Sequence, residues 1–448
     1  MSLDSQAWLE AHPEIASLRL AAADLNGIAR GKRIPAGHAQ KAFGGGIRMP
    51  LSALNADIWG ADIKDSPLVF QSGDADGKLL PTGRGPVPMP WFDTPSALLP
   101  LWAFNDDETP FAGDPRQALR AVLDGFKARG LTPVVATEME FYLLDARAAM
   151  PSPPESPATG RRLAAMDVLS LSALDEFDQF FTDLYAACAL IDIPDDAAIS
   201  EGGTGQFEIN LLHRNDALAA ADDAWLFKIA ARGVARRHGM AASFMAKPYA
   251  DQPGNGLHVH FSLLDDKGNN VFDDGSERGS ETLHHAVAGV LRLMPASTLI
   301  FAPHGNSYAR LTPHSHAPTA AAWGYENRTV ALRIPGGQGH ARRIEHRAAG
   351  GDVNPYLMLA AVLGAALSGI EDALAPPAPT SGDAYGAGAE PLPTDWKTAM
   401  DLFEESEEIK RIFPPLLIDN LLRCKRQESA RLAEMDEAEA LQTYLETV

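Results

Sequence analysis

Residues 134–144 read Val-Val-Ala-Thr-Glu-Met-Glu-Phe-Tyr-Leu-Leu, an apolar stretch that carries two acidic side chains. Its aliphatic and aromatic residues are typical of β-strands, so the stretch predicts a strand. Glu138 and Glu140 are two residues apart, and side chains with that spacing lie on the same face of a strand. Two adjacent buried carboxylates repel each other and lose hydration, which is costly unless a cation lies between them. The pattern therefore indicates either a metal site or the solvated face of an edge strand.

Two further segments carry polar side chains in apolar surroundings, one after a glycine-rich turn and one in an alternating strand pattern. Their polar residues are Glu201, Glu208, His258, His260 and Ser262. The predicted strands are residues 206–212 and 257–264. A single histidine in a strand is usually a core residue, but two histidines on one face, in a chain with two carboxylate pairs, favour metal ligands.

Arginines add a second chemical signal. Residues 343–347 read Arg-Ile-Glu-His-Arg, which places two arginines and Glu345 on one face of a strand. Three more arginines lie in the segment 306–337: Arg310, Arg328 and Arg333. Carboxylates with one or two imidazoles suit Mg²⁺ or Mn²⁺, and guanidinium groups suit phosphate oxygens. The residues therefore predict a metal-dependent enzyme that binds or transfers a phosphoryl group, without the GxxxxGK[ST] segment of a P-loop.

Composition narrows the class of partner. The chain has 448 residues and a formal net charge of -21. This acidic balance argues against nucleic acid and anionic membranes as partners, because both bind basic patches. The only cysteines, Cys188 and Cys424, are far apart in the sequence, so we expect free thiols and a location in the cytoplasm. The longest apolar run, residues 357–370, follows Asn354-Pro355 and predicts a buried helix that is too short to cross a bilayer.

The composition of the sequence and its pattern of predicted elements change near residue 108. The segment before it is rich in glycine, proline and short apolar runs, which predicts strands joined by turns. After it, Asp114-Pro115 predicts the start of a helix that ends at Gly130, and strands then alternate with helices such as 174–190. A further strand is expected at 330–335, and loops at 150–161 and 375–393. We therefore expect an α+β protein with a boundary near residue 108.

In this order, the segments resemble those of the glutamine synthetase family over nearly the whole chain. Five blocks carry the resemblance: residues 138–140, 201–208, 254–262, 306–310 (Asn-Ser-Tyr-Ala-Arg) and 343–347. The resemblance implies a small N-terminal β-grasp domain, residues 1–108, followed by a large catalytic α/β domain, residues 109–448, built on a curved antiparallel sheet. It also implies a homo-oligomer of two stacked rings, a dodecamer, with active sites between neighbouring subunits.

The family resemblance also implies a reaction and a role for each motif residue. ATP would phosphorylate the γ-carboxylate of glutamate, and an amine would then displace phosphate to form an amide. One metal would be held by Glu140, Glu201 and Glu208, and a second by Glu138, His258 and Glu345. ATP would be bound by His260, Ser262 and Arg343. Glutamate would be bound by Gly254, Arg310 and Arg347. The phosphoryl group would be stabilised by Arg328 and Arg333.

The sequence departs from the family pattern where ammonia would bind. Ammonia-using members carry an acidic residue six positions after the arginine of the Asn-Ser-Tyr block, and His316 stands there in this chain. A second acidic position falls near residues 47–50, which contain no carboxylate. Residues 322–329 and 24–32 resemble the branch of the family that glutamylates putrescine and other polyamines. We therefore expect a primary amine as the acceptor, and His316 as a base that helps to deprotonate it.

Other functions stay open from the sequence alone. Synthesis of glutamine from ammonia would need another carboxylate to replace the missing pair, and Glu326 or an aspartate of the N-terminal domain is a candidate. A ligase for ethanolamine or methylamine would share every motif described above. An inert structural family member is a third alternative, although all six positions that match metal ligands keep a glutamate or a histidine.

Overall fold

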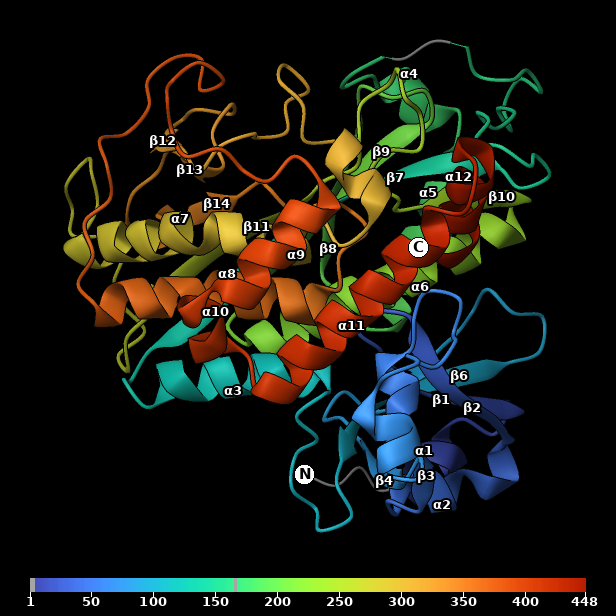
Figure 1. Ribbon diagram of the computed structural model, residues 1–448. Helices are drawn as coiled ribbons and strands as arrows, with labels where there is room; N and C mark the ends of the chain where they lie inside the picture. The colour runs from blue at the N-terminus through green and yellow to red at the C-terminus, as the bar shows by residue number, and fades with distance from the viewer. Residues whose placement is uncertain (1–4, 165–166) are drawn as a thin grey trace.

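Two β-sheets organise the chain, and they are drawn from successive parts of the sequence. The structure is a computed structural model that describes residues 5–164 and 167–448. Strands before residue 105 form a six-stranded sheet, and later strands form an eight-stranded sheet. Figure 1 shows the first sheet in blue below the body that contains the second sheet and most of the helices. The chain therefore has the expected α+β fold.

The six-stranded sheet has the order β2-β1-β6-β4-β3, with β5 paired to β6. Its strands are β1 Ser17–Ala23, β2 Ala29–Pro35, β3 Ile47–Pro50, β4 Asp76–Pro81, β5 Val87–Pro88 and β6 Ser96–Phe104. The β1–β6 pair is parallel and the other pairs are antiparallel. On β1, Leu18 and Leu20 pack into the core of this sheet, whereas Ala21 and Ala23 pack into the core of the body. Both faces of β1 are therefore buried, which accounts for its continuous apolar sequence.

The eight-stranded sheet has the order β12-β13-β14-β11-β7-β9-β8, with β10 paired to β7. Its strands are β7 Thr132–Asp145, β8 Asp195–Ser200, β9 Gln206–Arg214, β10 Met240–Ser243, β11 Leu257–Leu264, β12 Trp323–Tyr325, β13 Leu332–Ile334 and β14 Ile344–His346. The strands predicted at 134–144, 206–212 and 257–264 are confirmed as β7, β9 and β11. The sheet is antiparallel as expected, except for the parallel pair β12–β13.

The strand expected at 330–335 was predicted too long. Only residues 332–334 pair as β13, and β12 beside it was not predicted at all. The backbone amides of Ala331 and Leu332 both donate to the carbonyl of Ala322, so the chain turns there and regular pairing begins only afterwards. Pro335 lacks an amide hydrogen, and regular pairing ends before it.

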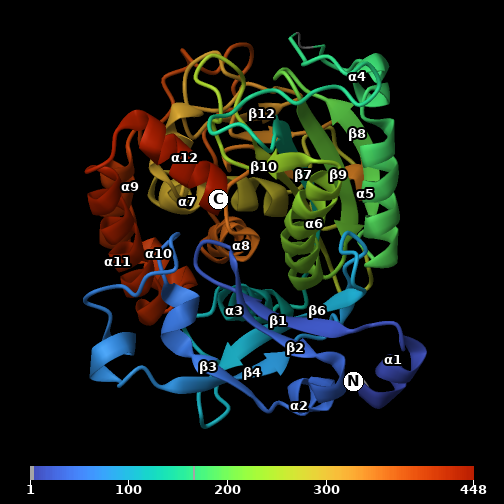
Figure 2. The same cartoon turned by 90° about the vertical axis from the view of Figure 1, so that its right-hand side faces the viewer.

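Helices cover one face of the eight-stranded sheet. They are α3 Pro115–Lys127, α5 Asp178–Leu190 and α6 Ala217–Arg237, with the buried α8 Pro355–Glu371 behind them. Figure 2 shows α5 and α6 beside β7 and β9. Alternate residues of β7, such as Met139 and Phe141, are buried on that side. The intervening residues, including Glu138 and Glu140, therefore lie on the opposite face.

The predicted helix starts are confirmed by their caps. Asp114 accepts hydrogen bonds from two amides in the first turn of α3, and Asn354 does the same for α8. The helix expected at 174–190 is divided into α4 Leu171–Asp175 and α5. The remaining helices are α1 Ser5–Ala11, α2 Ala39–Phe43, α7 Glu281–Phe301, α9 Trp396–Glu405, α10 Glu407–Ile412, α11 Pro415–Leu432 and α12 Glu437–Thr447. Over the described ranges, no helix is long and apolar enough to cross a membrane.

Buried polar contacts fasten the six-stranded sheet to the body. The Asn354 side chain donates to the carbonyl of Asp24 at 2.8 Å, and Trp225 donates to the carbonyl of Gly27 at 2.9 Å. From α11, the fully buried carboxylate of Glu428 accepts from Asn26 and from the amide of Ile58. We propose residue 108 as the domain boundary, because it lies between the end of β6 and the start of α3.

Close contact between α7 and α8, which lie side by side in Figure 1, depends on glycine and yields a stability prediction. A Cβ atom on Gly289 would lie 2.2 Å from the carbonyl oxygen of Ala365 and 2.7 Å from the Cα atom of Gly369. We expect Gly289→Ala to lower the free energy of unfolding by about 1–3 kcal/mol, the usual cost of overpacking a core. Gly37→Ala is the control, because its Cβ would meet nothing within 4 Å. Equal thermal unfolding midpoints for the two variants would contradict this account of the packing.

Candidate active site

The register of the sheet brings the predicted polar residues into one row. On the face of the sheet opposite α6, Glu140 of β7 pairs with Glu208 of β9. Glu138 lies between Asn210 of β9 on one side and His258 of β11 on the other. On the next strands, Glu345 of β14 lies between His260 of β11 and Arg333 of β13. Four adjacent antiparallel pairings therefore collect side chains that are up to 207 positions apart in the sequence, as from Glu138 to Glu345.

These side chains line two neighbouring cavities. The first has a volume of about 560 Å³ and contains most of the predicted site residues: Glu138, Glu140, Glu201, Glu208, Gly254, His258, Arg310, His316, Arg328, Arg333, Glu345 and Arg347. The second, of about 360 Å³, is lined by the three residues predicted to bind ATP: His260, Ser262 and Arg343. Glu138 lines both cavities, so it forms part of the wall between them.

Two groups of side chains in the first cavity are close enough to hold a metal ion. Ligand atoms of Glu138, His258 and Glu345 lie within 4.8 Å of one another, as do those of Glu140, Glu208 and His258. His258 is common to both groups, with Nδ1 2.9 Å from Glu138 and Nε2 3.9 Å from Glu140. Glu201 lines the same cavity but belongs to neither group.

Burial and mutual repulsion shift the pKa values of several carboxylates in the first cavity. Burial, together with repulsion from neighbouring carboxylates, raises the pKa of Glu201 to about 7 and that of Glu208 to about 9. Burial also acts on Glu138, but hydrogen bonds from His258 and His260 hold its pKa well below the ordinary value. Buried glutamates that repel one another, together with an imidazole nitrogen, form the donor set that Mg²⁺ or Mn²⁺ prefers. The residues present therefore fit a divalent cation.

Arginines hold the other side of the first cavity. The fully buried carboxylate of Glu345 is paired with Arg347 and, at 2.9 Å, with Arg333. Arg310 is also buried, and its guanidinium donates to the carbonyl of Ala348 at 2.9 Å. Arg328 lies at the rim, where it is exposed and has no hydrogen bond or ion pair among the described residues. Fixed and free guanidinium groups together give the cavity the positive charge that carboxylates and phosphates require.

Gly254 is required by the close approach of neighbouring chain segments. A Cβ atom at this position would lie 2.4 Å from the carbonyl oxygen of Ala246 and 2.9 Å from the Cγ atom of Arg310. Its own carbonyl accepts a hydrogen bond from Gln206 at 3.0 Å. The glycine therefore has a packing reason for its identity, and it also leaves the cavity wall free of a side chain.

In the second cavity, Arg343 donates from Nε to Nδ1 of His260 at 3.1 Å. The other ring nitrogen of His260 lies 2.8 Å from the Glu138 carboxylate. The His260 ring therefore connects an arginine of one cavity to a carboxylate shared by both. His213 and His340 also line this cavity, and sequence reasoning did not identify either of them.

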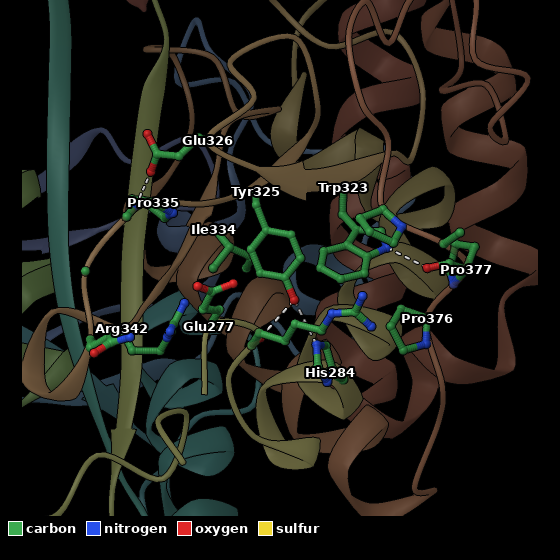
Figure 3. Close-up of a pocket in the computed structure, with 16 residues that line it drawn as sticks. Glu277, His284, Trp323, Tyr325, Glu326, Ile334, Pro335, Arg342, Pro376 and Pro377 are labelled. Carbon is green, nitrogen blue, oxygen red and sulfur yellow. Dashed lines mark hydrogen bonds between the residues drawn. The ribbon is translucent and has the colours of Figure 1, made fainter. Parts of the chain in front are cut away.

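A third cavity, of about 790 Å³, is lined in part by Glu326, the ion-pair partner of Arg333. Figure 3 shows Trp323 and Tyr325 at its centre and Glu326 at its far edge. The Tyr325 hydroxyl donates to the carbonyl of Arg278 at 2.8 Å, and Glu326 is paired with Arg333 at 3.3 Å. Arg333 is thus held between Glu345 in the first cavity and Glu326 in the third. Because Glu326 lines a different cavity from His316, it does not supply the missing acidic group beside that histidine.

Other residues of the first cavity were missed by sequence reasoning. Asn210, which donates to Glu208 at 3.2 Å, shares the alternation of β9 with that glutamate, and this signal could have identified it. Val168, Leu169 and Ile199 line the rim of the cavity. Apolar residues at a rim have no distinguishing pattern in the sequence, so no signal could have found them.

Comparisons with known proteins agree with the family resemblance of the sequence motifs. Residues 112–444 match the model of the glutamine synthetase catalytic domain. The chain is 37% identical to gamma-glutamylputrescine synthetase of Escherichia coli (strain K12), over 94% of this chain and 90% of that protein. It is 34% identical to glutamate–isopropylamine ligase of a Pseudomonas species, over 93% and 92% of the two chains. The solved structure of a GmaS–ADP complex superposes with a TM-score of 0.84 at 28% identity, covering 98% of both chains.

The raised pKa values predict how the metal-free protein responds to pH. A carboxyl group with a raised pKa binds more protons in the folded state, so its contribution to stability falls as the pH rises from about 4.5 toward the raised value. We therefore expect the thermal unfolding midpoint of the metal-free protein to decrease as the pH is raised from 6 to 9, because this range includes the raised pKa values of Glu201 and Glu208. Saturating Mn²⁺ should reverse most of this loss, and more so at higher pH, because metal and protons compete for the same oxygens.

A matched pair of variants isolates the repulsion. We expect Glu208→Gln to stabilise the metal-free protein at pH 9 by more than about 1 kcal/mol, since one unit of pKa shift corresponds to about 1.4 kcal/mol. The same variant should lose most of the stabilisation by Mn²⁺. Glu390→Gln, at an exposed position outside the cavities, should behave as the wild type. A Mn²⁺ response that survives Glu208→Gln would exclude this carboxylate from the metal site.

Proposed function

The chain belongs to the glutamine synthetase family, and we propose that it is an ATP-dependent ligase that joins the γ-carboxylate of glutamate to a primary amine. The observation that carries this proposal is the wall shared by two cavities. One cavity combines metal-binding carboxylates with arginines, and the other contains His260, Ser262 and Arg343. An acid that must be phosphorylated by a nucleotide needs both compartments, with cations at the point where they meet.

The residues divide the reaction between them. Arg310, Arg347 and Gly254 would position glutamate so that its γ-carboxylate oxygen attacks the γ-phosphorus of ATP and ADP leaves. Arg328 and Arg333 would stabilise the negative charge of the transferred phosphoryl group. The amine then attacks the carbonyl carbon of the acyl phosphate, the carbon–oxygen bond to phosphate breaks, and the proton lost by the amine passes to a base, for which His316 is our candidate.

A divalent cation, Mg²⁺ or Mn²⁺, would neutralise charge on the transferred phosphate. We propose two sets of ligands for it, as the family resemblance implies: Glu140, Glu201 and Glu208 in one set, and Glu138, His258 and Glu345 in the other. The protein's contribution is to hold these side chains close together, most of them on neighbouring strands of one sheet.

Assembly and location are part of the same proposal. We propose a homo-oligomer of two stacked rings, a dodecamer, in which a neighbouring subunit closes each active site. A location in the cytoplasm is supported by the two cysteines, Cys188 and Cys424, which are both free and buried.

A panel of acceptors tests the proposed reaction directly. Phosphate release with glutamate and ATP should depend on a primary amine, with putrescine, spermidine, isopropylamine, ethanolamine and methylamine compared with ammonium. We expect amines to saturate the enzyme at concentrations at which ammonium gives little turnover. Glu138→Ala and His258→Ala should each reduce the rate by at least about 10³-fold without changing the oligomer measured by light scattering. Saturation by ammonium alone would instead make the protein a glutamine synthetase, and activity that survives both substitutions would refute the site.

The role of His316 is tested by two replacements, asparagine and aspartate, which are isosteric with each other. His316 has a backbone φ of 63°, a left-handed conformation that Asp and Asn tolerate better than most residues. We expect His316→Asn to lower kcat/KM for the amine at least tenfold and to change the pH dependence of kcat/KM, because the base is removed. His316→Asp restores a carboxylate and should favour ammonium over amines relative to His316→Asn. Identical pH profiles for wild type and His316→Asn would exclude this histidine as the base.

A further inference from the structure

We propose that Asp352 is a positioning residue, which fixes the Arg310 guanidinium for the binding of glutamate through the hydroxyl of Ser307. This inference rests on the proposed ligase function and deepens it by naming a buried pair that governs the affinity for glutamate. Arg310 lines the first cavity, whereas Asp352 and Ser307 do not. The pair would therefore act on the substrate only through Arg310.

The Ser307 hydroxyl is engaged on two sides. It donates to the carboxylate of Asp352 and accepts from the backbone amide of His304 at 3.1 Å. The carbonyl of the same serine accepts from the amide of Arg310 at 3.2 Å. These bonds close a 3₁₀ turn, η4 Gly305–Ala309, which Arg310 directly follows. The hydroxyl therefore fixes the turn from which the arginine side chain extends.

The Arg310 side chain joins the same two segments a second time. Its guanidinium donates to the carbonyl of Ala348 at 2.9 Å and to that of Arg347 at 3.3 Å. Asp352 follows in the same segment, so the guanidinium and the Ser307–Asp352 hydrogen bond lie side by side as two links between the segments. Loss of the second link would leave the direction of the guanidinium to the first alone.

The segment 347–353 is a fixed base for these contacts. From α6, the buried Lys228 donates from Nζ to the carbonyl of Val353 at 2.7 Å. The amide of Gly350 donates to the carbonyl of Phe301 at 2.9 Å. Because this segment is held by the body of the protein, the hydrogen bond to Asp352 places the serine turn relative to the body.

An acidic side chain at position 352 is not explained by stability. The Oδ1 atom of Asp352 is buried and has no hydrogen-bond partner among the described residues. Burial raises the pKa of this carboxyl group, and the hydrogen bond from Ser307 opposes that rise. A Cβ atom on Gly350 would lie 2.5 Å from Oδ1, so the glycine leaves room for the carboxylate. A buried oxygen without a partner opposes folding, which favours a role in the site for this residue.

The guanidinium has little space in which to move without loss of function. A Cβ atom on Gly254 would lie 2.9 Å from the Cγ atom of Arg310. A Cβ atom on Gly256 would lie 2.8 Å from Nη2 of Arg310 and 3.4 Å from Oε2 of Glu140. The charged end of the arginine is thus close to a predicted metal ligand, and a small displacement would misplace the glutamate that it binds. Ser307, Asp352 and Arg310 are all buried inside the chain, so these contacts do not depend on a neighbouring subunit.

Steady-state kinetics at saturating amine separate the binding of glutamate from that of ATP. We expect Ser307→Ala and Asp352→Ala each to raise the KM for glutamate about tenfold, with the KM for ATP within about twofold of the wild type. Asp352→Asn keeps an oxygen that accepts from Ser307, so its KM for glutamate should stay within about threefold of the wild type. The double variant should be no worse than either single variant, because each substitution removes the same hydrogen bond.

Tyr356→Phe is the matched control. The Tyr356 hydroxyl donates to the buried carboxylate of Asp222 at 2.7 Å, and neither residue lines a cavity described above. We expect this variant to unfold at a lower temperature and to keep the wild-type KM for glutamate. Binding is also measured directly, as the rise in the unfolding midpoint that glutamate causes. This rise should shrink in Ser307→Ala and Asp352→Ala but not in Tyr356→Phe.

Failure of this inference is distinguishable from failure of the proposed function. A KM for glutamate that is unchanged in Ser307→Ala and Asp352→Ala, that rises together with the KM for ATP, or that rises additively in the double variant would overturn the positioning role while the ligase function stands. If Asp352→Ala does not fold, Ser307→Ala and Asp352→Asn provide the same comparison. Absence of phosphate release from the wild type with every amine would refute the ligase function, and the midpoint shifts with glutamate would still test the positioning of Arg310.

Discussion

Repulsion among carboxylates is the constraint on which the site is built. The antiparallel register of β7 with β9 and β11 places Glu138, Glu140, Glu208 and His258 next to one another on one face of a sheet whose other face is packed by helices. The packed face prevents the strands from separating, so the acidic side chains cannot move apart to relieve the repulsion. Hydrophobic burial behind the sheet thus maintains an arrangement of charges that a cation stabilises.

Arginines limit this repulsion on the other side of the cavity. Arg333 pairs with Glu345 and Glu326, which belong to different cavities, and Arg347 also pairs with Glu345. Glu345 therefore begins with both oxygens engaged by guanidinium groups. For Glu345 to coordinate a metal, at least one of these pairs must be exchanged, and Glu326 keeps Arg333 close to the cavity when that happens.

The sequence predicts the position of a residue well where that residue belongs to a repeating pattern of apolar and polar side chains. The alternation of apolar and polar residues is enough to predict the strands β7, β9 and β11 and the shared face of Glu138 and Glu140. The same alternation could not find β12, a three-residue strand that pairs with equally short β13. Nor could it place Leu169 at the rim, because that position follows from hydrogen bonds to Ser200 and not from any local pattern. The cavity lined by Glu326 could likewise not be predicted from the sequence, since its walls come from four separate segments.

Strands and connecting segments carry different residues of the site, and this difference affects how such an enzyme can evolve. The predicted metal ligands are mostly carried by strands of the central sheet, where a substitution disturbs a paired neighbour on each side. Val168, Leu169 and His316 are carried by connecting segments that are attached at a few backbone positions. Mutations can therefore accumulate at the mouth of the first cavity without altering the predicted metal ligands on the sheet beneath it. A lineage with this architecture can exchange one nitrogen source for another in a few steps, and acceptor preference is expected to diverge faster than the ability to activate glutamate.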